Sequence, residues 1–170
     1  MNARQIKSFL MATTTGLALG LSALAQAGHT NHVLTVPLSG GDMVGSAGDM
    51  DGSGYGFVFG VDNDPKTLCY VIKVEGIQMV PVKKGMAAHI HEAAMGKNGA
   101  PVAALAGPED GDAADCLTEG EKGKFPTGEA GIVKRILENP SDFYINIHNP
   151  DFPNGAIRGQ LQGAHSMGKM

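Results

Sequence analysis

Residues 54–74 read GYGFVFGVDNDPKTLCYVIKV, and this stretch decides the fold class. Residues 54–61 and 68–74 are short runs rich in β-branched and aromatic side chains, which is typical of strands. The segment VDNDPKT between them combines asparagine, aspartate and proline, residues that favour turns. We therefore expect residues 54–74 to form two antiparallel strands joined by a turn.

Five further segments have the length and composition of strands: residues 32–38, 86–93, 101–107, 142–149 and 155–162. Turn-forming stretches such as GKNGAP (96–101) and PDFPNG (150–155) separate several of them. A helix is expected only at 128–140, GEAGIVKRILENP, where Pro140 ends it. The pattern predicts an all-β protein, an antiparallel sandwich or barrel with one short helix.

The first 27 residues have the organisation of a secretory signal peptide. Arg4 and Lys7 precede an apolar run at 9–25, and residues 25–27, AQA, form a small-x-small cleavage site. We expect cleavage after Ala27, an exported protein that is periplasmic or secreted, one domain at 28–162 and a flexible tail at 163–170. No later segment is apolar enough to span a bilayer, so no membrane span is expected after cleavage.

The charge balance argues against a nucleic-acid partner. The chain has 13 basic and 17 acidic residues, and cleavage after Ala27 removes two basic residues and no acidic one. Binding to phosphates depends on clustered lysine and arginine side chains. The mature chain is mildly acidic and has no basic run, so we expect no nucleic-acid binding.

Cys69 and Cys116 are the only cysteines. In an exported chain, two cysteines without a CxxC neighbour favour a disulfide bond. A catalytic thiol or a cysteine-based metal site is the alternative.

Three histidines are predicted to lie on the same side of two strands. Side chains alternate between faces along a strand, so His89 and His91 in AHIHE share one face and Ile90 points to the other. In DFYINIHN the apolar residues mark the core face, which places His148 on the opposite face. The core-facing set is Phe143, Ile145 and Ile147, and the outward set is Tyr144, Asn146 and His148, with Arg158 and Gln160 outward on the last strand.

Three neutral imidazoles form a donor set that suits copper or zinc. We therefore predict a metal site at His89, His91 and His148. A metal-bound imidazole usually needs a hydrogen-bond partner for its second nitrogen, and Glu92 and Asn146 are the polar candidates nearby in the sequence. The alternatives are solvated histidines that bind no metal, and copper sites at the termini formed by His29 and His32 or by His165, Met167 and Met170.

The segments HIHEAAMGKNGAPVAAL and FYINIHNPDFPNGAIRGQL resemble the chordin-type (CHRD) domain family, over most of residues 33–162. The second segment is the more specific, because nine of its residues fall in register with the family pattern: Asn146, His148, Pro153, Gly155, Ile157, Arg158, Gly159, Gln160 and Leu161. Ala93 and Ala94 stand where a glycine is expected, and Ala156 replaces an acidic residue. The resemblance implies a bacterial exported protein with an immunoglobulin-like or superoxide-dismutase-like Greek-key β-sandwich, and it implies no established reaction.

A fainter likeness is to copper/zinc superoxide dismutase. His89, His91 and Glu92 resemble a His-x-His-Glu strand segment of that enzyme, His148 resembles a later copper ligand, and Arg158 resembles its anion-guiding arginine. The zinc site has no counterpart, because no histidine lies between His91 and His148. The likeness implies at most one metal ion.

These observations predict an exported CHRD-type binding module with one copper or zinc site and, as a further partner, another exported protein. The alternatives are a copper-dependent oxidoreductase with dismutase-like chemistry, and a structural or protein-interaction module without metal.

Overall fold

The computed structural model describes residues 33–163. The predicted signal peptide, the terminal histidines His29, His32 and His165, and all but the first residue of the predicted tail lie outside the described residues. No helix in residues 33–163 is both long enough and apolar enough to cross a membrane.

Eight antiparallel strands form one sheet in the order β5-β4-β7-β8-β1-β2-β3-β6. Their bounds are β1 (Leu34–Ser39), β2 (Ser53–Val61), β3 (Asp64–Glu75), β4 (Ala87–Glu92), β5 (Pro101–Leu105), β6 (Asp112–Thr118), β7 (Phe143–His148) and β8 (Ile157–Gln160). One α-helix, α1 (Ile132–Glu138), and three 3-10 turns, η1 (Gly40–Asp42), η2 (Val82–Lys84) and η3 (Pro140–Asp142), complete the described elements. The all-β class with one short helix is therefore confirmed, while the Greek-key detail stays a prediction.

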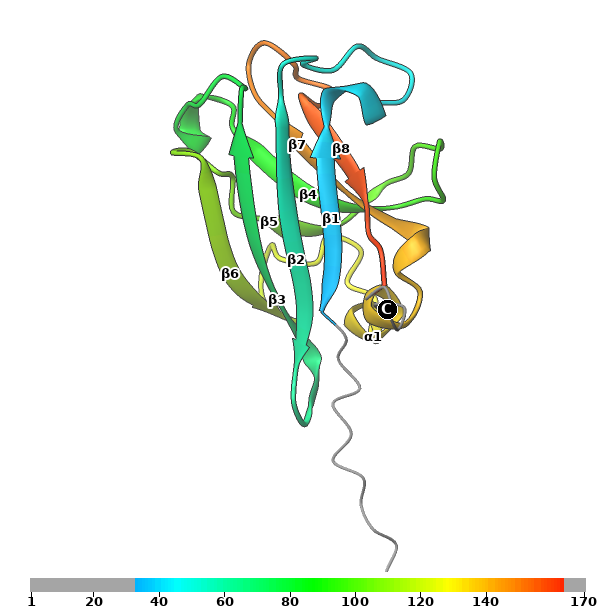
Figure 1. Ribbon diagram of the computed structural model, residues 1–170. Coiled ribbons are helices and arrows are strands. Elements are labelled where there is room, and N and C mark those ends of the chain that lie inside the picture. The colour runs from blue at the N-terminus through cyan, green and yellow to red at the C-terminus, as the bar shows by residue number, and fades with distance from the viewer. Residues whose placement is uncertain (1–32, 164–170) are drawn as a thin grey trace, which may run out of the picture.

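The sheet folds over, so that its two halves face each other. In Figure 1, β6, β3, β2 and β1 form one layer, and β4 and β7 pass behind it. A Cβ atom built on Gly56 of β2 would lie 3.6 Å from Cδ1 of Ile145 on β7, which shows how closely the layers pack. The buried core draws on both halves, with Val58 and Ile72 from one and Ile90 and Ile145 from the other.

The hairpin predicted from residues 54–74 is β2–β3. Phe57 pairs with Val71 in an antiparallel register, and the turn closes where Val61 pairs with Asp64. Asn63 has a φ of 63°, a left-handed conformation that asparagine adopts more readily than most residues. The hairpin is confirmed, although β3 begins at Asp64, four residues earlier than predicted.

Strand β6 was not predicted from the sequence. Its sequence, DAADCLT, contains few residues that favour strands, and only Leu117 is buried. Tertiary pairing with β3 forms the strand, and this pairing places Cys116 opposite Cys69. The two cysteines form the predicted disulfide.

Helix α1 is shorter than the predicted 128–140. Gly131 precedes it with a φ of 82°, and the helix ends before Pro140. The carboxylate of Glu119 accepts hydrogen bonds from the backbone nitrogens of Gly131 at 2.9 Å and Val133 at 3.0 Å. This distant side chain supplies the cap that the local sequence lacks.

Candidate metal centre

The pairing of β4 with β7 brings the three predicted histidines together. Ala87 is opposite His148 and His89 is opposite Asn146, so His148 lies diagonally beside His89 on one face of the sheet. The ring centroids are 5.4 Å apart for His89 and His148, 5.7 Å for His89 and His91, and 6.4 Å for His91 and His148. Each ring offers one nitrogen, and these three nitrogens lie within 4.8 Å of one another.

The buried side-chain nitrogen and oxygen atoms that lack a hydrogen-bond partner in residues 33–163 all belong to this face. They are Nδ1 of His89, Nε2 of His91, Nε2 of His148 and Oδ1 of Asn146. Buried polar atoms in proteins are nearly always paired, and an exception needs an explanation. A metal ion bound by the three imidazole nitrogens would provide one.

Backbone carbonyl groups determine which imidazole nitrogen is free. Nδ1 of His91 lies 2.9 Å from the carbonyl oxygen of Gly99, and Nδ1 of His148 lies 3.0 Å from that of Pro153. A carbonyl oxygen only accepts, so each Nδ1 carries the proton and donates it. Nε2 of both rings then presents a lone pair, as metal ligation requires.

Glu92 and Asn146, the orienting partners expected from the sequence, make other contacts. The Glu92 carboxylate pairs with Arg135 of α1 at 2.5 Å. Nδ2 of Asn146 donates to the carbonyl oxygen of Asn154 at 3.2 Å. The structure keeps Asn146 beside the histidines, but it directs Glu92 to the helix.

Much of the face that carries the histidines is covered, although the three histidines themselves are half-buried. The exposed fraction is 2% for Tyr144, 6% for Asn146 and 3% for Arg158. The sequence placed these residues on the correct face, but it did not anticipate that loops would cover that face. Arg158, for example, donates to the carbonyl oxygen of Lys97 at 2.7 Å and to Oδ1 of Asn98 at 2.8 Å.

Tyr144 is a residue of the site to which the sequence analysis gave no role. Its ring stacks on His91 with centroids 4.9 Å apart, and Cζ of Arg158 lies 3.4 Å from its centroid. Its hydroxyl accepts a hydrogen bond from the backbone nitrogen of Gly99 at 3.3 Å. The strand alternation could have identified it, because Tyr144 lies on the same face of the strand as Asn146 and His148.

Partial burial keeps His89 and His91 neutral at neutral pH. Desolvation, with smaller contributions from His148 and His91, lowers the pKa of His89 to about 4. The pKa of His91 is also lowered, mainly by desolvation and further by the charges of His148 and Arg158, although its hydrogen bond to Gly99 opposes this. Neutral imidazoles at neutral pH are the form that binds metal ions.

A cavity of about 310 Å³ adjoins the histidines. His91, His148 and Arg158 lie in its wall, together with Met43 and Pro153. A ligand in the cavity would therefore lie beside two of the three imidazoles.

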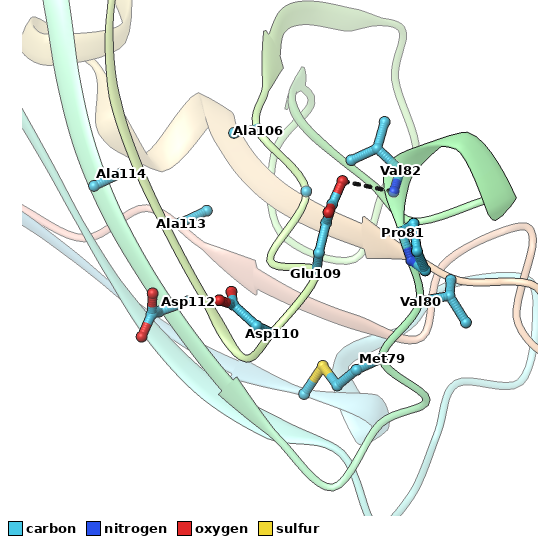
Figure 2. Close-up of a pocket in the computed structure, with 11 residues that line it drawn as sticks. Met79, Val80, Pro81, Val82, Ala106, Glu109, Asp110, Asp112, Ala113 and Ala114 are labelled. Atoms are coloured by element: carbon cyan, nitrogen blue, oxygen red, sulfur yellow. Dashed lines mark hydrogen bonds between the residues drawn. The ribbon is translucent and has the colours of Figure 1, made fainter.

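A larger cavity of about 520 Å³ lies between the η2 region and the start of β6. Figure 2 shows the Glu109 side chain in it, with a carboxylate oxygen that accepts a hydrogen bond from the Val82 nitrogen at 2.7 Å. Within residues 33–163, none of the buried polar atoms without a partner belongs to this cavity. It therefore gives no comparable indication of a ligand.

The residues present fit copper or zinc. Both metals accept three imidazole ligands and leave a further coordination position for another ligand. Cys69 and Cys116 form a disulfide, so no thiolate in the described chain competes for the metal.

Comparison with known protein families matches residues 34–161 to the CHRD domain. Searches among curated proteins and among solved structures gave no match. The match spans the whole sheet, from the start of β1 to just beyond β8, and includes all three histidines. The chain therefore belongs to the CHRD domain family.

Proposed function

We propose that this protein is an exported binding module that holds one copper or zinc ion at His89, His91 and His148. The observation that carries the proposal is the convergence of three buried imidazole nitrogens without partners within 4.8 Å. Metal to imidazole distances of about 2.0 to 2.1 Å need donor nitrogens roughly 3 to 4 Å apart. Small side-chain rotations would close the remaining gap.

The residues around the histidines would orient them for such an ion. Gly99 and Pro153 hold the two Nδ1 protons, and Tyr144 supports the ring of His91. When bound, copper or zinc would act as a Lewis acid, and copper would add one-electron chemistry. The open coordination position would be reached from the cavity beside His91 and His148.

Metal titration tests the proposal. Chelator-treated protein should bind one equivalent of Cu(II) or Zn(II) tightly, as measured by isothermal titration calorimetry. His89→Ala, His91→Ala and His148→Ala should each lose that site, while His165→Ala, which changes the tail, should keep it. Circular dichroism would confirm that each variant is folded. Unchanged binding in all three site variants would refute the proposal and place the metal at the termini. No binding by the wild-type protein would also refute it and leave a module without metal.

Export is the second part of the proposal, and it is supported by the signal-peptide pattern of residues 1–27. N-terminal sequencing of the protein recovered outside the cytoplasm should read GHTNH, which corresponds to cleavage after Ala27. A recovered chain that still begins at Met1 would contradict the cleavage.

A copper-dependent oxidoreductase is the second candidate function. The observation that favours it is the presence of Arg158 in the same cavity wall as His91 and His148. A superoxide disproportionation assay on copper-loaded protein separates this candidate from a module that only binds. Activity no higher than that of the His148→Ala variant would exclude it.

A further inference from the structure

Arg158 is a buried cation whose direct partners are all neutral. Its side chain is 3% exposed. It donates to Oδ1 of Asn98 and to the carbonyl oxygen of Lys97, and it lies over the ring of Tyr144. Within residues 33–163 it has no salt bridge with a carboxylate, and among acidic side chains only the charge of Asp42 acts on it, without direct contact.

A buried guanidinium without a carboxylate is costly. Buried charges in proteins are normally paired, because desolvation disfavours the charged form. The two carbonyl-type oxygens and the aromatic ring offset part of this cost, but they bring no negative charge. The buried guanidinium of Arg158 therefore favours the binding of an anion that the chain itself does not supply.

The cavity beside the histidines gives such an anion a place to bind. Arg158 lies in its wall, and Nη1 and Nη2 each use one N–H group for a protein oxygen. Each of these nitrogens carries a second N–H group, and the planar guanidinium matches a carboxylate. Met43, Val44 and Pro153 add apolar surface to the same wall. A volume of about 310 Å³ suits a small ligand.

We propose that this cavity binds a short carboxylic acid in its ionised form, with the carboxylate on Arg158 and the hydrocarbon part against Met43 and Pro153. This site does not require the metal ion, so it goes beyond the proposed function. A ligand bound there would lie beside His91 and His148, which line the same cavity.

The test uses butyrate and chelator-treated full-length mature protein. Calorimetry and NMR titration should show saturable binding at one site, with shifts in the Arg158 and Asn98 side-chain signals. Butanamide has the same shape without the charge, and it should not saturate over the same concentration range. Equal binding of butyrate and butanamide would overturn the proposal.

Asn98→Asp is the decisive variant. Oδ1 of residue 98 already accepts from Arg158, so one oxygen of the new carboxylate would keep this contact and neutralise the guanidinium within the fold. The variant loses the hydrogen bond that Nδ2 of Asn98 donates to the carbonyl oxygen of Val44, so circular dichroism and copper titration must show that the fold and the metal site are retained. Butyrate affinity should fall at least about tenfold, because the ligand would lose its charge-assisted partner. Unchanged affinity in Asn98→Asp would refute the proposal. Arg158→Gln should show the same loss if it folds.

Arg135→Gln is the matched control. It removes the same charge from α1, where Arg135 pairs with Glu92 and Glu129 and does not line the cavity. Butyrate binding should be unchanged. Copper titration of the same wild-type sample measures the metal site separately. Failure of butyrate to bind would refute the carboxylate proposal, and failure of copper to bind would refute the metal proposal, so the two results can be distinguished.

Discussion

His91 and Tyr144 lie face to face on adjacent strands, with ring centroids 4.9 Å apart and an interplanar angle of 13°. They are register partners in β4 and β7, and Arg158 on the next strand, β8, lies over the same tyrosine ring. The tyrosine therefore connects the proposed metal ligand to the buried cation. Both neighbours contact the ring of Tyr144.

Replacement of Tyr144 separates the role of its ring from that of its hydroxyl. Tyr144→Phe keeps the stacking and loses the contact with Gly99, so we expect metal affinity within a few-fold of wild type. Tyr144→Leu removes the support of His91, and affinity should fall about tenfold or more, as for other residues that orient a ligand. Competition titration with a chromogenic chelator measures both. Equal affinities in the two variants would show that the ring has no positioning role.

Gly99→Ala tests the loop that orients His91. A Cβ atom at residue 99 would overlap the carbonyl oxygen of Glu92, so the loop would have to move. We expect a loss of stability of about 1 to 3 kcal/mol and weaker metal binding, because the Gly99 carbonyl accepts from His91. Urea unfolding and metal titration measure the two effects.

Gly96→Ala is the control in the same loop. Its φ is +74°, so alanine is strained there, but an added Cβ would meet no atom within 4 Å. Stability should fall by about 1 to 2 kcal/mol, from the strained backbone alone, while metal affinity is retained. If Gly96→Ala weakened metal binding as much as Gly99→Ala, general loosening of the loop would explain the result.

Stability of the metal-free protein should decrease below neutral pH. The pKa of His89 is lowered to about 4, whereas an unfolded histidine has a pKa of about 6.5. The unfolded chain therefore binds more protons in this range, and the stability that is complete above pH ~6.5 is lost as the pH falls through ~4. His91, whose pKa is also lowered, acts in the same direction.

Urea midpoints of chelator-treated protein at pH 7.5, 5.5 and 4.5 measure this loss. His89→Gln is neutral at every pH, so its midpoint should fall less over the same range. The carboxylates of Asp64 and Asp115 also have lowered pKa values, but from an ordinary value of 3.8, so they act mainly below this window. A wild-type midpoint that is constant from pH 7.5 to 4.5 would contradict the lowered pKa values of His89 and His91.

The disulfide should contribute measurably to stability. It joins residues separated by 47 positions, so the chain-entropy model assigns it roughly 4 kcal/mol. The double variant Cys69→Ala/Cys116→Ala should lose about this amount in urea unfolding. Thr67→Val/Thr118→Val is the comparison on the same two strands, where the two hydroxyl oxygens lie 2.8 Å apart and form a hydrogen bond. Its removal should lower the free energy of unfolding by about 1 kcal/mol. Equal losses from the two double variants would show that the covalent link adds little.

The strands that were predicted correctly are those whose pattern is local. The hairpin at β2–β3 and the apolar alternation of Phe143, Ile145 and Ile147 are readable because each strand buries its own apolar residues. Strand β6 could not be read in this way. Its residues are mostly exposed, and only the pairing with β3 makes them a strand.

The sequence by itself determined the residue types of the site and the strand face on which each lies, because side chains alternate along any strand. It placed His89 and His91 on one side of Ile90, and His148 opposite Ile147. The distances among the three rings were decided by the tertiary structure, since they depend on the register between β4 and β7. The protonated nitrogens and the burial of Arg158 were likewise decided there, because the loops that supply Gly99, Asn98 and Pro153 fold over that face only in the complete structure.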